Sequence, residues 1–427
     1  MPSAGAHAQQ PRGGVVGVEF PRGYHAGADY ALAPVGARTA EQKLAEAVNL
    51  LQALDVEVFH AESVQLSRII PATLVGGGVV ERLAEVVKAK QLDVVLVDAQ
   101  LSPRQQRELE VKLNVKVLDR TGVILDIFAA RARTRAGILQ VEAAQLAYQQ
   151  SRLVRLWSHL ERQRGGMGKT GGPGERQLEL DKRMLRSRLA KVKAELREVE
   201  QTRGLQRMAR NRAGVPTVAL VGYTNAGKST LFNRLVSAGT LVADALFATL
   251  DPLMRKMKLP TGQEVVLIDT VGFIADLPHE LVEAFKATLE EVTMADLLLH
   301  VHDAANPEQE AQAADVENVL GQIGAGGKRT LQVFNKVDTV ADVYVPKEAW
   351  GVSAVTGQGV EDLLAAITER LQEGWVKLKV KVSAADGRRL AWLHAHGTVE
   401  TQELKGETWH LAVRLNPADA AQWESMK

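Results

Sequence analysis

The residues from Gly222 to Thr230 have the types and spacing that bind nucleotide phosphates. Their sequence, GYTNAGKST, fits G-x-x-x-x-G-K-S between an apolar segment (217–221) and a helix-like segment (231–236). Backbone N–H groups of such a loop converge on a β-phosphate, and the helix start adds the positive end of its dipole. We predict that Lys228 neutralises the β- and γ-phosphates and that the Ser229 hydroxyl binds Mg2+. The predicted phosphate-binding residues are Gly222, Tyr223, Thr224, Asn225, Ala226, Gly227, Lys228, Ser229, Thr230 and Gly272.

Two downstream motifs are expected to complete a magnesium site with Ser229. Asp269-Thr-Val-Gly272 follows an apolar segment, which predicts the Asp269 carboxylate in the water shell of Mg2+ and the Gly272 N–H at the γ-phosphate. Thr249 lies between the Gly222–Thr230 motif and the Asp269–Gly272 motif, where a switch loop offers a hydroxyl to the metal. The structural alternatives are an ordinary loop threonine at 249 and a helix-capping aspartate at 269.

A third motif, Asn335-Lys336-Val-Asp338, decides which base is bound. A carboxylate at Asp338 accepts from guanine N1–H and the 2-amino group, whereas adenine offers neither donor. Ser353-Ala354 follows another apolar segment and is expected to give the backbone contact to guanine O6. The five motifs in this order predict a GTPase that binds GTP and GDP with Mg2+.

Two positions bear on the mechanism of hydrolysis. Phe273 directly follows Asp-x-x-Gly, where Ras-like enzymes have a water-orienting glutamine, so we expect slow turnover without an activator. Packing of Phe273 in the core would have the same consequence. Asn225 stands where some GTPases hold a potassium ion, and a turn-forming asparagine is an equally good interpretation.

The elements that must position these residues follow an alternating α/β pattern. We expect a small parallel α/β domain (1–125), an antiparallel helical hairpin arm (126–212), a doubly wound P-loop GTPase domain (213–373) and a small α+β domain (374–427). Heptad-spaced apolar residues predict the two helices of the arm, and six glycines in residues 165–174 predict the break between them. Other expected helices are 41–54, 79–90, 103–113 and 388–396, and expected strands are 15–20, 56–59, 93–97, 115–118, 376–382 and 408–415.

Composition excludes several classes of protein. There is no cysteine, which excludes disulfides and thiol catalysis, and no apolar run reaches the roughly 18 residues of a membrane helix. We expect a monomeric, cytoplasmic protein without membrane insertion. Residues 151–212 contain 17 Lys and Arg against 7 Asp and Glu, a net charge of +10 in a chain that carries +1 overall. Such an arm favours a phosphate-rich partner, although a solvated cationic face is the alternative. The predicted RNA contacts are Lys169, Arg176, Arg183, Arg186 and Arg188.

Motifs beyond those of a generic GTPase resemble the HflX family over roughly residues 39–373. They include Ile70-Pro-Ala-Thr73, Leu101-Ser-Pro103, Glu108-Leu-Glu110, Asp119-Arg-Thr121, Ile124-Leu-Asp-Ile-Phe128, Gly172-Pro-Gly-Glu175, Phe247-Ala-Thr-Leu-Asp-Pro252 and the run from Asp269 to His279. The resemblance implies a translational GTPase that binds the large (50S) ribosomal subunit and splits stalled or idle 70S ribosomes under stress. It also implies that the ribosome stimulates hydrolysis.

Three residues depart from the family pattern: Gly171 and Arg176 at the arm tip, and Leu253 after Asp-Pro. Two further functions stay open beside ribosome splitting. One is a ribosome-assembly GTPase acting on 50S precursors. The other is an RNA-binding or remodelling protein with an ATP site in the N-terminal domain, for which Gly76-Gly77-Gly78 is the only sequence hint.

Overall fold

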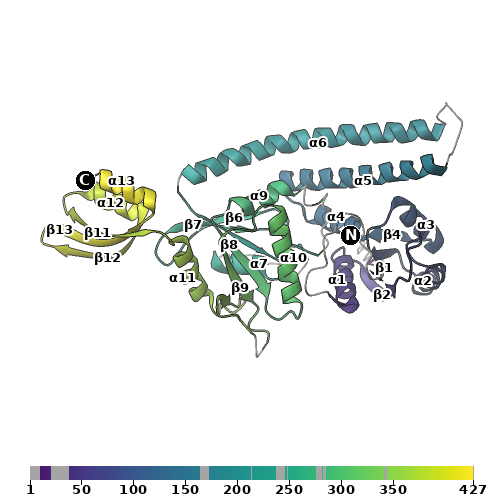
Figure 1. Ribbon diagram of the computed structural model, residues 1–427, viewed down its shortest axis with the longest axis horizontal. Helices are drawn as coiled ribbons and strands as arrows, with labels where there is room; N and C mark the ends of the chain where they lie inside the picture. Colours follow the sequence, from purple (N-terminus) through teal and green to yellow (C-terminus); the bar gives the residue numbers. More distant parts are fainter. Residues whose placement is uncertain are drawn as a thin grey trace, which may run out of the picture.

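The computed structural model describes residues 10–20, 38–163, 173–212, 214–236, 246–247, 249–275, 281, 285–340 and 344–426. Four units follow one another along the chain: an N-terminal α/β unit, the helical hairpin, a second α/β unit that corresponds to the predicted GTPase domain, and a C-terminal α+β unit (Figure 1). The predicted fold class is confirmed in all four parts. No helix among these residues combines the length and the apolar character needed to cross a bilayer.

The N-terminal unit is a four-stranded parallel sheet in the order β2-β1-β3-β4, covered on both faces. Helices α1 and α4 pack on one face, and α2 and α3 pack on the other. Capping boxes at Thr39 and Ser102 start α1 and α3. The elements are β1 (Arg12–Glu19), α1 (Ala40–Gln52), β2 (Glu57–Gln65), α2 (Gly77–Lys90), β3 (Val94–Asp98), α3 (Pro103–Leu113), β4 (Lys116–Asp119) and α4 (Arg120–Arg131).

Two elements of this unit differ from the sequence-based expectation. Strand β2 continues six residues beyond Phe59, because it pairs with the full length of β1 while its polar residues lie at the sheet edge. Helix α4 was not predicted and runs across the domain boundary expected at residues 125/126. Asp119 caps it, and its apolar side chains enter the core of the N-terminal unit.

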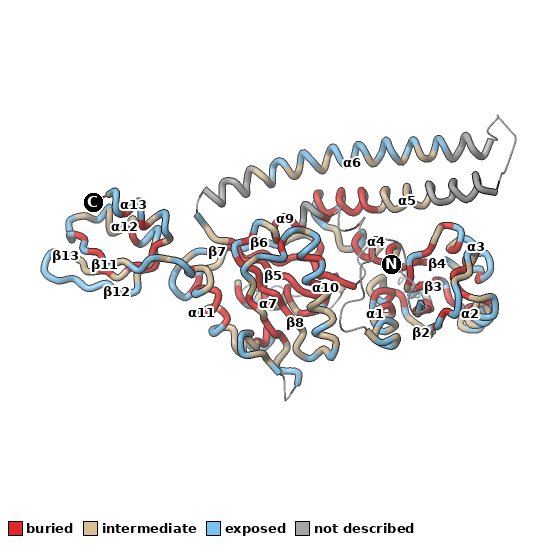
Figure 2. Tube along the Cα trace, viewed as in Figure 1, coloured by how far each residue is buried: buried red, intermediate tan, exposed pale blue. Residues whose placement is uncertain are grey.

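The arm consists of α5 (Arg135–Gln163) and α6 (Pro173–Arg212), which run antiparallel. Leu139, Ala143 and Val192 form the buried seam between them, as the heptads predicted, with Leu146, Leu189, Leu196 and Val199 packed alongside. The arm does not project freely, because the first half of α5 is buried against the neighbouring units (Figure 2). The side chains of residues 153–178, which include Arg176, and all of Lys169 lie outside the described part of the chain.

The third unit is a six-stranded sheet in the order β10-β9-β8-β5-β7-β6, in which only β6 is antiparallel to its neighbour. Helices α7 and α11 cover one face, and α9 and α10 cover the other, so the sheet is doubly wound. The elements are β5 (Thr217–Gly222), α7 (Lys228–Leu235), β6 (Leu253–Lys258), β7 (Glu264–Asp269), α9 (Lys286–Met294), β8 (Leu297–Asp303), α10 (Gln309–Gln322), β9 (Thr330–Asn335), β10 (Ala349–Gly351) and α11 (Val360–Leu371).

The C-terminal unit is a three-stranded antiparallel sheet in the order β11-β13-β12, with two helices on one face. The expected alternation of β11 is confirmed, because Val380 and Val382 are buried while Lys379 and Lys381 are exposed. Strand β12 and helix α13 were not predicted. The elements are β11 (Val376–Ser383), α12 (Gly387–His396), β12 (Gly397–Lys405), β13 (Thr408–Leu415) and α13 (Pro417–Ser425).

One hydrophobic core is shared by the first and third units. Phe128 of α4 makes edge-to-face contacts with Phe247 and Phe285, at ring-centroid distances of 4.7 and 4.9 Å. The same cluster contains Leu50 of α1 and Ile268 of β7. The N-terminal unit is therefore packed against the GTPase unit rather than merely tethered to it.

Candidate functional site

The phosphate loop joins β5 to α7. Lys228 is the first residue of α7, and its buried ammonium donates to the backbone oxygens of Gly222 (3.1 Å) and Tyr223 (2.7 Å). Burial lowers the pKa of Lys228 to about 8, although the charge of Asp269 acts in the opposite direction. Gly227 has a φ of 85°, and a Cβ there would lie 2.2 Å from Asn335 Nδ2, so the loop requires glycine at this position.

The three residues predicted to bind magnesium come together at the end of β7. Ser229 Oγ and Thr249 Oγ1 both donate to Asp269 Oδ2, at 2.6 and 2.8 Å, and the two hydroxyl oxygens are 2.7 Å apart. The other carboxylate oxygen, Asp269 Oδ1, is buried and has no hydrogen-bond partner among the described residues. Burial raises the pKa of Asp269, and the hydrogen bonds from the two hydroxyls oppose that rise. Two hydroxyls beside an unsatisfied carboxylate oxygen are suited to Mg2+, which takes few protein ligands besides phosphate and water.

The guanine motifs also meet, through the side chain of Asn335. Asn335 holds the loops together, since its Nδ2 donates to Ala226 O (2.9 Å) and its Oδ1 accepts from Ala354 N (3.0 Å). The Ala354 N–H thus has a partner within the site, and the backbone contact expected from Ser353-Ala354 to guanine O6 stays a prediction. Ser353 is buried, and its hydroxyl accepts from the N–H of Thr356. This contact of Ala354 was not predictable from local sequence, because the acceptor lies 19 residues away.

The two remaining members of the Asn-Lys-x-Asp motif differ in exposure. The Lys336 ammonium forms an ion pair of 2.8 Å with Asp303, at the end of β8. Asp338 is exposed, so its carboxylate is accessible to a ligand. Asn225 is also exposed and has a φ of 61°, a conformation that asparagine tolerates. Its backbone fits the turn interpretation, and its exposure leaves the side chain accessible to an ion.

The segment after Asp269 lies directly on the phosphate loop. Phe273 N donates to Gly222 O (3.1 Å), and Phe273 O accepts from Thr224 N (2.7 Å). A Cβ on Gly272 would lie 2.9 Å from the Thr224 Cα atom, so glycine allows this close approach. The Phe273 side chain is buried in the shared core, where it lines a small apolar cavity with Phe128 and Phe285. The described structure thus agrees with the expectation that residue 273 does not orient water.

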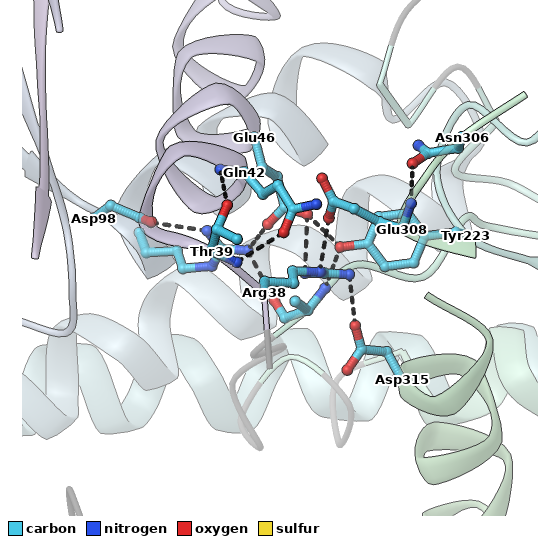
Figure 3. Close-up of polar contacts among 11 residues, drawn as sticks. Arg38, Thr39, Gln42, Glu46, Asp98, Tyr223, Asn306, Glu308 and Asp315 are labelled. Carbon is cyan, nitrogen blue, oxygen red and sulfur yellow. Dashed lines mark hydrogen bonds and ion pairs between the residues drawn. The ribbon is translucent and has the colours of Figure 1, made fainter. Parts of the chain in front are cut away.

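A buried charged cluster connects the N-terminal unit to this site (Figure 3). Glu46 of α1 accepts from the Tyr223 hydroxyl and from Arg120 Nη2. The Tyr223 hydroxyl accepts in turn from Ala275 N (2.8 Å), and Arg120 Nη2 donates to Ala275 O (3.0 Å). The phosphate loop and the segment after Gly272 are thus both held by side chains of the N-terminal unit.

Arg38 and Asp98 extend the cluster in opposite directions. Arg38 bridges Glu46 (3.3 Å) to Glu308 (3.1 Å) and Asp315 (2.7 Å), which lie just before and within α10. Arg120 Nη1 donates to Asp98 at the end of β3 (2.8 Å). Burial alone would raise the pKa of Glu46, but the charges of the two arginines and the Tyr223 hydrogen bond outweigh it and lower that pKa.

No role was predicted for Arg38, Glu46, Asp98 or Arg120, or for Asp251, which binds the start of α5. Arg120 and Asp251 did lie in the family-specific motifs Asp119-Arg-Thr121 and Phe247–Pro252. These charged residues have no part in nucleotide chemistry, and their presence in such motifs was the signal that could have indicated a structural role.

The predicted RNA contacts can be placed only in part. Arg183, Arg186 and Arg188 are exposed on α6. Arg188 also forms an ion pair with Glu142 of α5 (2.6 Å), so one of the three has a structural partner within the arm.

Four family models match consecutive parts of the chain. Residues 41–129 match "GTP-binding GTPase N-terminal" and residues 131–210 match "GTP-binding GTPase Middle Region". Residues 217–336 match "50S ribosome-binding GTPase" and residues 340–426 match "HflX C-terminal domain".

Curated relatives are similar over nearly the whole length. GTPase HflX of Magnetococcus marinus is 51% identical over 396 residues, which is 91% of either chain. GTPase HflX of Escherichia coli is 45% identical over 398 residues, covering 88% of this chain and 93% of that one. Among solved structures, a GTP-binding protein from Sulfolobus solfataricus in complex with GDP is 19% identical with a TM-score of 0.44, and the match covers 85% of this chain and 99% of that one.

Proposed function

The chain belongs to the HflX family of GTPases, and from that premise we propose that it binds the large ribosomal subunit and splits 70S ribosomes under stress. We infer that it acts in the cytoplasm as a monomer and that the ribosome stimulates its hydrolysis of GTP. The family model matched by residues 217–336 carries the description "50S ribosome-binding GTPase", which supports the choice of partner.

The nucleotide site supports a switch that depends on an activator. We assign Ser229, Thr249 and Asp269 to Mg2+, which when bound would offset negative charge on the phosphates. Lys228 would bind the β- and γ-phosphates, and Asp338 would accept from guanine. Phe273 has no hydrogen-bonding atom on its side chain, so unassisted turnover should be slow. Potassium held by Asn225 is one way to supply the missing charge.

The cationic surface of α6 is the observation that carries the choice of an RNA partner. Its exposed cations extend over several turns on the helix surface, which suits repeated contacts with phosphates. They are Arg183, Arg186, Arg188, Lys191, Lys193 and Arg197. The first half of the other helix of the hairpin, α5, is buried in the core that the N-terminal and GTPase units share, so an RNA bound to α6 would contact an arm that is packed against both units.

Sedimentation of purified 70S ribosomes tests the proposal directly. With GTP or a non-hydrolysable analogue, the full-length protein should convert 70S particles into 30S and 50S subunits, and GDP should not support this conversion. Lys228→Ala serves as the nucleotide-binding control and should be inactive with every nucleotide. Intact 70S particles under all conditions would contradict splitting. Binding confined to immature 50S particles would instead identify an assembly GTPase.

A further inference from the structure

A carboxylate of the GTPase unit holds the first turn of the arm. Asp251 Oδ2 accepts from Thr134 N (2.8 Å) and Arg133 N (3.0 Å), and Asp251 Oδ1 accepts from the Thr134 hydroxyl. Thr134 is the residue that precedes α5, and its hydroxyl accepts from Gly137 N (3.1 Å). The start of the arm helix is therefore capped by Thr134, and Thr134 is itself fixed by Asp251.

Gly137 makes room for this contact. A Cβ at position 137 would lie 2.3 Å from Asp251 Oδ1 and 2.9 Å from its Cγ. Glycine inside a helix destabilises the helix relative to alanine. Helix stability alone would thus favour alanine, and the approach of Asp251 explains the glycine.

Asp251 is separated by one residue from Thr249, whose hydroxyl bonds to Asp269 (2.8 Å) and contacts Ser229 (2.7 Å). The intervening Leu250 is buried in the shared core. Pro252 then restricts the backbone, and β6 begins at the next residue by pairing with Asp269. The backbone from Thr249 to Leu253 has little conformational freedom. A displacement of the Asp251 carboxylate should therefore also move the Thr249 hydroxyl.

We propose that Asp251 is a positioning residue for GTP. Its hydrogen bonds to the start of α5 hold Thr249 where its hydroxyl can bind the metal near the γ-phosphate. Binding of GTP and formation of the contact between Asp251 and the arm are then coupled. A ligand that binds more tightly when Asp251 contacts the arm raises the affinity of the protein for GTP. By linkage, GTP raises the affinity for that ligand by the same factor. This inference deepens the proposed function, because the arm is the surface assigned there to ribosomal RNA.

Comparing the affinities for a GTP analogue and for GDP distinguishes a positioning role of Asp251 from a general effect on protein stability. The γ-phosphate and its Mg2+ order the switch threonine of a GTPase, and GDP does not. Loss of the Asp251 contact should therefore weaken binding of a GTP analogue and spare GDP. A single hydrogen bond to a charged group contributes about 1.5–3 kcal/mol, and loss of that free energy from binding of the analogue corresponds to roughly tenfold to a hundredfold weaker affinity.

Gly137→Ala tests this in the full-length protein, because its Cβ would displace Asp251 while no residue of the nucleotide site is itself substituted. The measurement is the Kd of fluorescent GDP and of a fluorescent non-hydrolysable GTP analogue, each with Mg2+. We expect Gly137→Ala and Asp251→Ala to weaken the analogue at least tenfold and to change GDP affinity less than twofold. Ile138→Ala, at the next and exposed position of α5, should leave both affinities unchanged.

Two results would overturn the proposal: unchanged affinity for the analogue in Gly137→Ala, or equal weakening of both nucleotides. Normal binding of GDP also reports that each variant is folded. The measurement uses the protein alone, so its outcome is independent of whether the protein binds or splits ribosomes.

Discussion

Replacing Arg120 by alanine should destabilise the protein far more than the loss of a surface arginine. Arg120 pairs with Glu46 and, at 2.8 Å, with Asp98, and the three side chains are exposed by only 10%, 16% and 8%. The alanine variant leaves two carboxylates in a poorly solvated place without this partner, and it removes the 3.0 Å bond to Ala275 O.

Magnitudes from other proteins set the scale of this effect. Breaking a buried ion pair by removing one partner costs about 3–5 kcal/mol, whereas an exposed pair contributes about 0–1 kcal/mol. A loss of 1 kcal/mol lowers Tm by roughly 2–4 °C in a unit of 150–250 residues. We therefore expect Arg120→Ala to lower Tm by at least about 6 °C.

Thermal unfolding followed by circular dichroism measures the change, with Arg82→Ala as the matched control. Arg82 also pairs with a glutamate, Glu62 at 3.1 Å, but its side chain is 53% exposed, and its loss should shift Tm by no more than about 4 °C. Equal shifts in the two variants would refute the assignment of a buried, stabilising cluster.

The dependence on pH gives a second measure of the same cluster. Because the folded state lowers the pKa of Glu46, its contribution to stability is present above the ordinary value of 4.5 and is lost as the pH falls through the lowered value. The charge of Arg120 makes the largest contribution to lowering the pKa of Glu46. Arg120→Ala should therefore lose the part of the acid dependence of stability that comes from this contribution. An identical acid dependence in both proteins would argue against the coupling of Arg120 to Glu46.

Three further predictions concern the nucleotide and the arm. Asp338→Asn should weaken GTP binding and favour xanthine nucleotides, because the amide reverses one donor and acceptor role; unchanged discrimination in a competition assay would exclude Asp338 from base recognition. Reversing the charges of Arg183, Arg186 and Arg188 should weaken 50S binding and reduce its salt dependence in filter-binding assays, and an unaltered salt slope would remove α6 from the RNA contact. If Asn225 holds potassium, sodium should not replace it in GTPase assays, whereas equal rates in both salts would leave Asn225 as a turn residue.

Contiguous motifs made the nucleotide site predictable. Ser229, Thr249 and Asp269 each belong to a short pattern whose spacing fixes its place at a strand end, and the structure brings their oxygens within 2.6–2.8 Å. The contacts of Glu46 and Asp251 had no such signature. Their partners lie 177 and 117 residues away, and only the packing of two units against each other brings them together.

Elements were missed for local reasons. Strand β12 is polar over most of its length, because it is an edge strand with exposed side chains, so it lacks the expected apolar alternation. Helix α13 did carry a readable signal, Asn416-Pro417 followed by Asp419, which is a typical helix start. Helix α4 is apolar on most sides and follows a strand directly, and so it merged with the long helical stretch expected after it.

The core shared through Phe128 limits how this chain can be divided. A cut between the N-terminal and GTPase units would expose Phe128 on one fragment and Phe247 and Phe285 on the other, and both new surfaces would invite aggregation. Activity measured on an isolated GTPase fragment would then report a damaged surface as well as a missing regulator. For the same reason, exchange of one unit between distant relatives should yield an unstable hybrid, because the two faces of the shared core would no longer fit each other.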